Sequence, residues 1–191
     1  MKLVAITGSI GCGKSTLANL IKELGYVVYD VDMWTRNLYK KDKFNALILK
    51  NFPQVNENGK VNKKLLRNIV FSDKTQLEKL ENIIHPILKQ KLRQVIKNNA
   101  DKNEIFFIDA ALIFELGWNR YCNCIIVADV DKNIQKQRVM KRDGISEYEY
   151  NNIINLQMSN YDKACRADVV INTNKSLGIL KVELFKVIGN I

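Results

Sequence analysis

The stretch that decides the fold is Gly8-Ser9-Ile10-Gly11-Cys12-Gly13-Lys14-Ser15. It matches the pattern Gly-x-x-x-x-Gly-Lys-[Ser/Thr], whose glycines let consecutive backbone amides curl around phosphate groups. The apolar run Leu3–Thr7 predicts a buried strand before it, and Thr16–Ile21 predicts a helix after it. The N-terminus of that helix adds partial positive charge where phosphates would lie. The sequence therefore predicts a phosphate-binding loop, or P-loop, between a strand and a helix.

The residues of this loop have separate expected roles in binding ATP. The ammonium group of Lys14 can reach the β and γ phosphates, and the hydroxyl of Ser15 can ligate Mg²⁺. A glycine-rich turn without a ligand is the competing interpretation, which the flanking strand and helix disfavour. Because a helix N-terminus lowers the pKa of a thiol, we expect Cys12 to be reactive; a buried, inert thiol is the alternative. The predicted ATP-binding residues are Gly11, Cys12, Gly13, Lys14, Ser15 and Thr16.

Four further apolar runs predict the rest of a sheet. They show no polar alternation, which is typical of parallel strands buried on both faces. Helical patterns separate them, as in a doubly wound α/β fold. We therefore predict an α/β protein with a doubly wound, parallel, five-stranded sheet. The four runs are residues 26–29, 105–108, 125–128 and 169–171.

Two long segments interrupt the predicted core. The first, between the second and third runs, is almost wholly helical in pattern and suggests a subdomain that binds an acceptor. The second follows the fourth run, is charged and helical, and suggests a lid. Pro86 should kink or start a helix, because proline has no amide hydrogen. The prediction is one domain with a core of about 1–32, 101–132 and 166–191, an acceptor subdomain of about 33–100 and a lid of about 133–165.

Composition and charge limit the function classes. Of 191 residues, 47% are hydrophobic and 26% charged, as in a folded globular protein. The N-terminal apolar run is too short for a signal peptide or a membrane span, so we expect a cytoplasmic protein without a membrane partner. The net charge is +10, but no arginine-rich run occurs, which favours a small polyanionic substrate over nucleic acid. Cys122-x-Cys124 lacks zinc-site spacing, and the only histidine is distant.

Acidic residues follow two of the predicted strands. Asp30 and Asp32 come after the second run, and Asp109 after the third. Ligands of doubly wound sheets lie at the carboxyl ends of the strands, so these side chains should face the site. Asp32 could deprotonate an acceptor hydroxyl, and Asp109 could help hold Mg²⁺ directly or through water. The alternative is that these aspartates cap the helices that follow.

Two arginines in the predicted lid share a helix face. Arg138 and Arg142 are four residues apart, so they lie one turn from each other. Guanidinium groups that converge on phosphates would stabilise the charge of a transferring phosphoryl group. A solvated face, with Asp131 and Asp143 nearby, is the alternative. We predict that both arginines act in the reaction.

Other motifs, the chain length and the two long segments indicate which class of P-loop protein this is. A GTPase would need the motif Asn-Lys-x-Asp, whose aspartate pairs with the guanine base. The segment Asn174-Lys175-Ser176-Leu177 begins like this motif but lacks the aspartate, which disfavours a GTPase. A motor or transporter ATPase would usually be larger. An acceptor subdomain and a lid that excludes water favour a small-molecule kinase. A nucleotide-dependent regulator or nucleic-acid-binding module remains the alternative from another class.

The ordered set of motifs resembles the dephospho-CoA kinase family over nearly the whole chain. The P-loop alone is unspecific, whereas the blocks in this order are much more specific. Besides the loop, the matching blocks are Asp30–Asp32, Asn82–Pro86, Asp109–Glu115, Arg138–Arg142 with Gln157, and Ala167–Asn172.

The resemblance implies a reaction and a set of residues. ATP, with Mg²⁺, would phosphorylate the ribose 3′-hydroxyl of dephospho-CoA to give CoA and ADP; another nucleotide or nucleoside kinase is the alternative. Asp32 would be the general base, and Lys14, Arg138 and Arg142 would stabilise the phosphoryl group. A purely structural role for the histidine beside Pro86 is the alternative to substrate contact. The implied acceptor-binding residues are Asp32, His85, Leu112, Phe114 and Glu115, and the implied metal ligands are Ser15 and Asp109.

Some positions depart from the family pattern. Ala111 replaces a usual proline, so the loop before Phe114 is expected to be less rigid. Asn62 and Lys63 stand where Asp-Arg is common, which weakens any arginine role there, and Cys12 replaces a more usual serine. For the oligomeric state we expect a monomer or a weak homo-oligomer.

Overall fold

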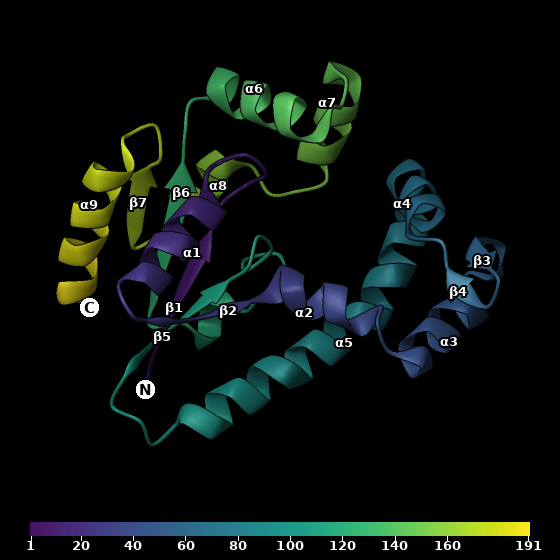
Figure 1. Cartoon of the computed structure of the whole chain (residues 1–191), viewed down its shortest axis with the longest axis horizontal. Helices are drawn as coiled ribbons and strands as arrows, with labels where there is room; N and C mark the ends of the chain where they lie inside the picture. Colours follow the sequence, from purple (N-terminus) through teal and green to yellow (C-terminus); the bar gives the residue numbers. More distant parts are fainter. The chain divides into compact units, whose positions relative to one another are not determined.

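A central parallel sheet organises the chain, which is described over residues 1–191 in a computed structural model (Figure 1). The strand order is β2-β5-β1-β6-β7, and all four neighbouring pairs are parallel. The prediction of a doubly wound five-stranded α/β sheet is therefore confirmed. Its strands are β1 (Lys2–Thr7), β2 (Val27–Asp30), β5 (Ile105–Asp109), β6 (Cys124–Asp129) and β7 (Val169–Asn172).

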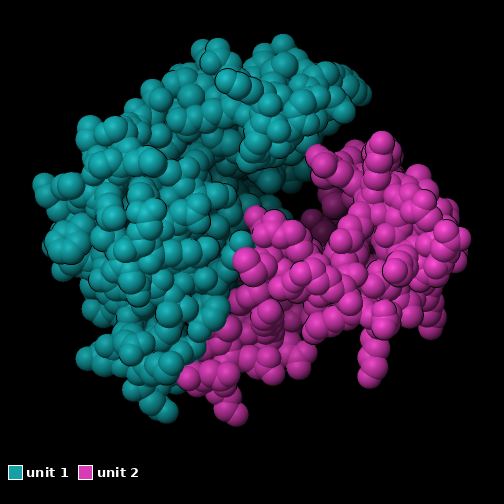
Figure 2. All heavy atoms as spheres, viewed as in Figure 1, with its two compact units in different colours: residues 1–30, 99–191 teal, residues 31–98 magenta.

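The chain divides into two compact units, residues 1–30 with 99–191 and residues 31–98 (Figure 2). The first unit holds the sheet and its main core, where β1 and β6 side chains such as Val4 and Ile126 pack with Leu17, Ile21 and Leu184 from two helices. The central strands β1, β5 and β6 are buried because apolar residues occupy both faces. The prediction of buried strands is wrong for β2 and β7, which are largely half-buried or exposed because they lie at the edges of the sheet. The helices of this unit are α1 (Lys14–Glu23), η2 (Asn119–Tyr121), α6 (Lys132–Asp143), α7 (Glu147–Asn155), α8 (Asn160–Ala164) and α9 (Leu177–Gly189).

Caps at the helix ends of this unit fix where the segment 133–165 turns. Asp131 accepts hydrogen bonds at the start of α6, and Gly144 ends that helix in the left-handed conformation. Ser146 and Glu149 then form a reciprocal capping box that starts α7. Ser159 caps α8. Each boundary therefore has a local cause in the sequence.

The second unit, residues 31–98, is mainly helical. Its elements are α2 (Val31–Leu38), α3 (Asp42–Asn51), η1 (Pro53–Val55), β3 (Asn56–Glu57), β4 (Lys60–Val61), α4 (Lys63–Ser72) and α5 (Lys74–Asn99). The side chain of Asn62 caps α4 by accepting from the backbone N–H of Leu65. Aromatic packing joins the residue that follows α2 to helix α3, since Tyr39 and Phe44 meet edge to face with ring centroids 5.0 Å apart.

The second unit differs from the sequence prediction in one place, and it decides between the two expectations for Pro86. The segment was expected to be almost wholly helical, yet β3 and β4 form an antiparallel hairpin. Asn58 and Gly59 both have positive φ, which a two-residue hairpin turn requires. The Asn-Gly pair in the sequence could therefore have predicted this hairpin. Pro86 does not start a helix but lies inside α5. The helix is bent in Figure 1, as expected where proline removes a backbone hydrogen bond.

Candidate active site

The phosphate loop joins β1 to α1 and depends on glycine at two positions. Gly11 and Gly13 have φ of 81° and 86°. A Cβ at Gly11 would lie 2.5 Å from Cγ2 of Val139, and one at Gly13 would lie 2.7 Å from Oγ1 of Thr173. A larger residue would therefore be strained and would clash with the elements around the loop.

Polar side chains from distant parts of the chain hold the start of the loop. The backbone N–H of Ser9 donates to Oδ1 of Asn160 at 2.9 Å, and that of Ile10 donates to Oε1 of Gln157 at 3.2 Å. Nε2 of Gln135 donates to the Ile10 carbonyl at 2.7 Å. These contacts fix the loop against α6 and α8, both of which belong to the same unit.

Thr173 connects the loop to one of the predicted arginines. Its hydroxyl donates to the carbonyl of Cys12 at 2.8 Å and accepts from Nη1 of Arg138 at 3.1 Å. Nη2 of Arg138 donates to the Thr173 carbonyl at 3.3 Å. Arg138 is thus held beside the phosphate loop. Arg142, on the same helix, instead makes two hydrogen bonds to Asp143 and has a side chain that is 60% exposed.

Lys14 and Asp109 form an ion pair at the carboxyl ends of β1 and β5. Their side chains are only 11% and 7% exposed. The two strands are neighbours in the sheet, and this places the first residue of α1 beside the last residue of β5. The loop ammonium group and the predicted metal-binding carboxylate therefore lie in direct contact.

The thiol of Cys12 does not have the character expected from its place near a helix N-terminus. Only 1% of the residue is exposed, and its side chain belongs to the main core cluster. Burial, with a smaller contribution from the charge of Asp129, raises the pKa of this thiol to about 12. The prediction of a lowered pKa and a reactive thiol is wrong, because desolvation outweighs the helix terminus.

The turn after β5 contains three residues that the family resemblance implies as acceptor-binding. Phe114 is buried, whereas Leu112 is half-buried. Oε1 of Glu115 accepts from the backbone N–H of Met158 at 3.0 Å and pairs with Nζ of Lys163 at 3.0 Å. Glu115 thus connects the turn to the segment that precedes β7.

The other two predicted acceptor residues lie in the unit of residues 31–98. Asp32 is in the first turn of α2, two residues after β2 ends at Asp30. His85 is half-buried in α5, next to Pro86. Burial lowers the pKa of His85, and the charge of Glu81 offsets this only partly. The imidazole should therefore be neutral near pH 7.

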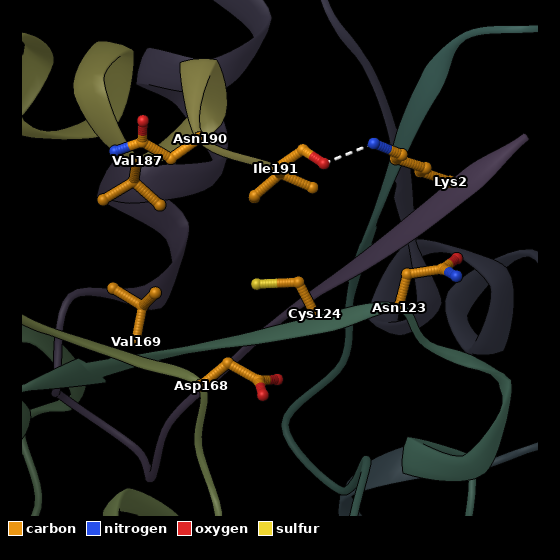
Figure 3. A pocket seen from close by; sticks show the side chains of 8 residues that line it. All are labelled: Lys2, Asn123, Cys124, Asp168, Val169, Val187, Asn190 and Ile191. Atoms are coloured by element: carbon orange, nitrogen blue, oxygen red, sulfur yellow. Dashed lines mark hydrogen bonds between the residues drawn. The ribbon is translucent and has the colours of Figure 1, made fainter.

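A cavity of about 490 Å³ lies at the opposite edge of the sheet from the phosphate loop. Lys2, Cys124 and Val169 line it at the amino ends of β1, β6 and β7. Figure 3 shows the Cys124 thiol and the Asp168 carboxylate on its wall. Its place at the amino ends of the strands separates it from the ion pair of Lys14 and Asp109.

Two further features of the chain concern membranes and metal ions. No helix is both long and apolar enough to cross a membrane. No group of three or more His, Cys, Asp or Glu side chains is arranged to hold a metal ion by itself. Mg²⁺ usually binds through one or two protein oxygens together with substrate phosphates, and the Ser15 hydroxyl and the Asp109 carboxylate fit that donor set.

Comparison with known proteins identifies the family. The family model described as dephospho-CoA kinase matches residues 2–178. A dephospho-CoA kinase of Bartonella quintana is 37% identical over 192 residues, which cover 100% of this chain and 98% of that protein. The chain belongs to the dephospho-CoA kinase family. It is thus an enzyme of the kinase class, with a P-loop nucleotide-binding fold.

Solved structures agree with this membership in the dephospho-CoA kinase family. TT1252 from Thermus thermophilus is 28% identical with a TM-score of 0.85, over 100% of this chain and 97% of that one. The dephospho-CoA kinase from Campylobacter jejuni is 27% identical with a TM-score of 0.71, and both chains are covered completely. The resemblance read from the motifs is therefore confirmed.

Sequence reasoning missed several residues of this kinase site. Thr173 directly follows β7, so the rule that selected Asp109 at a strand end could also have found it. Gln135 and Asn160 carry no signal of their own, because polar residues in predicted helices are usually assigned to solvent. Lys163 was missed for the same reason: a lysine in a short capped helix is expected to be exposed, whereas this one is buried.

Proposed function

We propose that the chain transfers the γ-phosphoryl group of ATP to the ribose 3′-hydroxyl of dephospho-CoA, giving CoA and ADP. The observation that carries the proposal is the family match over residues 2–178 around a phosphate loop with Lys14 and Asp109 in contact. Phosphoryl transfer needs chiefly positioning and positive charge, and the site supplies both.

On the ATP side, loop amides and the ammonium group of Lys14 would bind the phosphates. Gly11 and Gly13 let the loop adopt positive φ and pack closely against Val139 and Thr173, which supports a curled backbone whose amides could bind phosphates. Arg138 lies beside the loop through Thr173, so its charge is available to the transferring group. Arg142 would have to exchange its contact with Asp143 for a phosphate when the segment 133–165 acts as a lid.

On the acceptor side, Asp32 would take the proton from the ribose hydroxyl. A carboxylate is needed because a ribose hydroxyl is a poor nucleophile, and a positioned base assists its attack. We propose that His85 lies near the acceptor and that Leu112, Phe114 and Glu115 contribute contacts to it. We also propose that the enzyme is cytoplasmic, as expected from the sequence.

The metal that accompanies ATP would be Mg²⁺, held by Ser15 and Asp109 together with the phosphates. When bound, it would stabilise charge on the phosphate oxygens. Lys14 would then share Asp109 with the ion. The protein contributes the orientation of both groups, since each is fixed at a strand end or a helix start.

An acceptor screen tests the proposal. ADP release would be followed with ATP, Mg²⁺ and one acceptor at a time, comparing dephospho-CoA with nucleosides, nucleotides and shikimate. We expect turnover with dephospho-CoA to exceed that with every other acceptor. A higher kcat/KM for a nucleoside or nucleotide would reject this acceptor and favour another small-molecule kinase.

A further inference from the structure

The unit of residues 1–30 and 99–191 contains a lysine with no solvent exposure. Lys163 lies in the short helix α8 and is 0% exposed. Lysine head groups normally reach water, because an isolated buried charge is strongly unfavourable. The burial of Lys163 therefore requires fixed partners, and these identify what the residue does.

Both partners lie in the turn that follows β5. Nζ of Lys163 donates to the carbonyl of Ala111 at 2.5 Å and pairs with Oε1 of Glu115 at 3.0 Å. The Ala111 carbonyl also accepts from the hydroxyl of Thr7 at 3.2 Å, and the same Glu115 oxygen accepts from the backbone N–H of Met158. One ammonium group thus holds both a carbonyl and a carboxylate of this turn.

Helix α8 is fixed to the phosphate loop at its other end. Oδ1 of Asn160 accepts from the backbone N–H of Ser9 at 2.9 Å, and Nδ2 donates to Oδ1 of Asp129 at 2.5 Å. The charge of Lys163 is also close enough to the loop to act on the thiol of Cys12. A single turn of helix therefore spans from the phosphate loop to the turn after β5.

We propose that Lys163 is a positioning residue that sets the turn carrying Leu112 and Phe114 at a fixed place relative to the phosphate loop. This inference rests on the proposed function, because that turn is the segment assigned to the acceptor. Lys163 has no contact with the reacting atoms. It acts by limiting the positions of the turn, and small misplacement of an acceptor is costly for the rate. Ala111 makes this support more necessary, because it lacks the rigidity of a proline.

Replacing Lys163 with methionine tests the proposal, since methionine fills a similar volume without the charge or the donors. Two rates are compared: phosphoryl transfer to dephospho-CoA, and ATP hydrolysis without an acceptor. We expect kcat/KM for dephospho-CoA to fall by on the order of a hundredfold, at least about tenfold more than ATP hydrolysis falls. Lys181→Met, which removes an exposed lysine paired with Glu23, is the control and should change neither rate. Equal losses in the two rates, or no loss, would overturn the proposal.

A second variant keeps the test decisive if Lys163→Met does not fold. Glu115→Gln keeps the size of the side chain and an oxygen that can accept from the Met158 N–H. It weakens the pairing with Lys163 and also removes the charge of any direct contact with the acceptor, so kcat/KM for dephospho-CoA should fall by about tenfold, and the double variant with Lys163→Met separates the two effects. Wild-type kcat/KM in that variant would overturn the proposal. If Lys163→Met folds, the double variant should be little worse than Lys163→Met alone, because both act through one pair; additive losses would contradict this.

Failure of the proposed function would be visible separately. In that case the wild-type protein would not phosphorylate dephospho-CoA but would phosphorylate another acceptor in the same screen. The comparison of Lys163→Met with wild type is then made with that acceptor, and a selective loss relative to ATP hydrolysis still supports the positioning role. An unselective loss overturns it for any acceptor.

Discussion

Replacing Thr173 with valine tests the contacts that fix the phosphate loop. Valine has nearly the same shape but no hydroxyl, so the bonds to the Cys12 carbonyl and from Arg138 are both lost. Thr173 is 5% exposed, and a net hydrogen bond is worth about 1 kcal/mol, with about 1 kcal/mol more for the buried carbonyl left without this partner. We count nothing for Arg138, which keeps its bond to the Thr173 carbonyl. The free energy of unfolding should therefore fall by about 2 kcal/mol.

For a chain of 191 residues, this loss corresponds to a melting temperature lower by about 4–8 °C. Thermal and urea unfolding of the wild type, Thr173→Val and Thr173→Ser measure it directly. Serine keeps the hydroxyl, so Thr173→Ser should retain most of the stability. The reasoning is refuted if the valine variant is as stable as the wild type, or if serine destabilises the protein as much as valine does.

Three further predictions concern individual side chains. Lys14→Ala should lower turnover by on the order of a hundredfold or more in a folded protein, because it removes a charge aimed at the transferring group; wild-type turnover would contradict the P-loop assignment. Asp32→Asn should lower turnover with dephospho-CoA by about a hundred- to ten-thousandfold at nearly unchanged ATP affinity. Asp30→Asn should lose less, and the reverse order would exclude Asp32 as the base. Iodoacetamide at about pH 8 should modify the exposed Cys165 but not Cys12, whose pKa is raised to about 12 by burial, as peptide mass spectrometry would show; alkylated Cys12 in the folded protein would contradict this.

The sheet and the phosphate loop could be predicted from the sequence because their causes are local. Each strand is a short run that is apolar on both faces, and the loop has glycines where the backbone needs positive φ. Asp109 could be predicted as a site residue from its place at a strand end. Its contact with Lys14 then follows from the adjacency of β1 and β5 in the sheet.

The contacts that hold the loop could not be predicted in the same way. Gln135, Asn160 and Lys163 reach the site only because the chain folds back from far along the sequence. The error on Cys12 has a similar cause: a helix N-terminus is visible in the sequence, but the burial that outweighs it depends on the tertiary packing of the core cluster to which Cys12 belongs. Local sequence patterns therefore predict the phosphate loop, whereas the residues that hold it in place depend on tertiary contacts.

The most direct test of the central claim follows the γ-phosphoryl group itself. The wild-type protein would be incubated with ATP labelled at the γ-phosphorus, Mg²⁺ and dephospho-CoA, and the product would be treated with a 3′-nucleotidase, a phosphatase that removes only 3′-phosphate monoesters. We predict that the label appears in CoA and is released by this phosphatase. Label found only in inorganic phosphate before this treatment, or in a product that resists the phosphatase, would contradict transfer to the ribose 3′-hydroxyl.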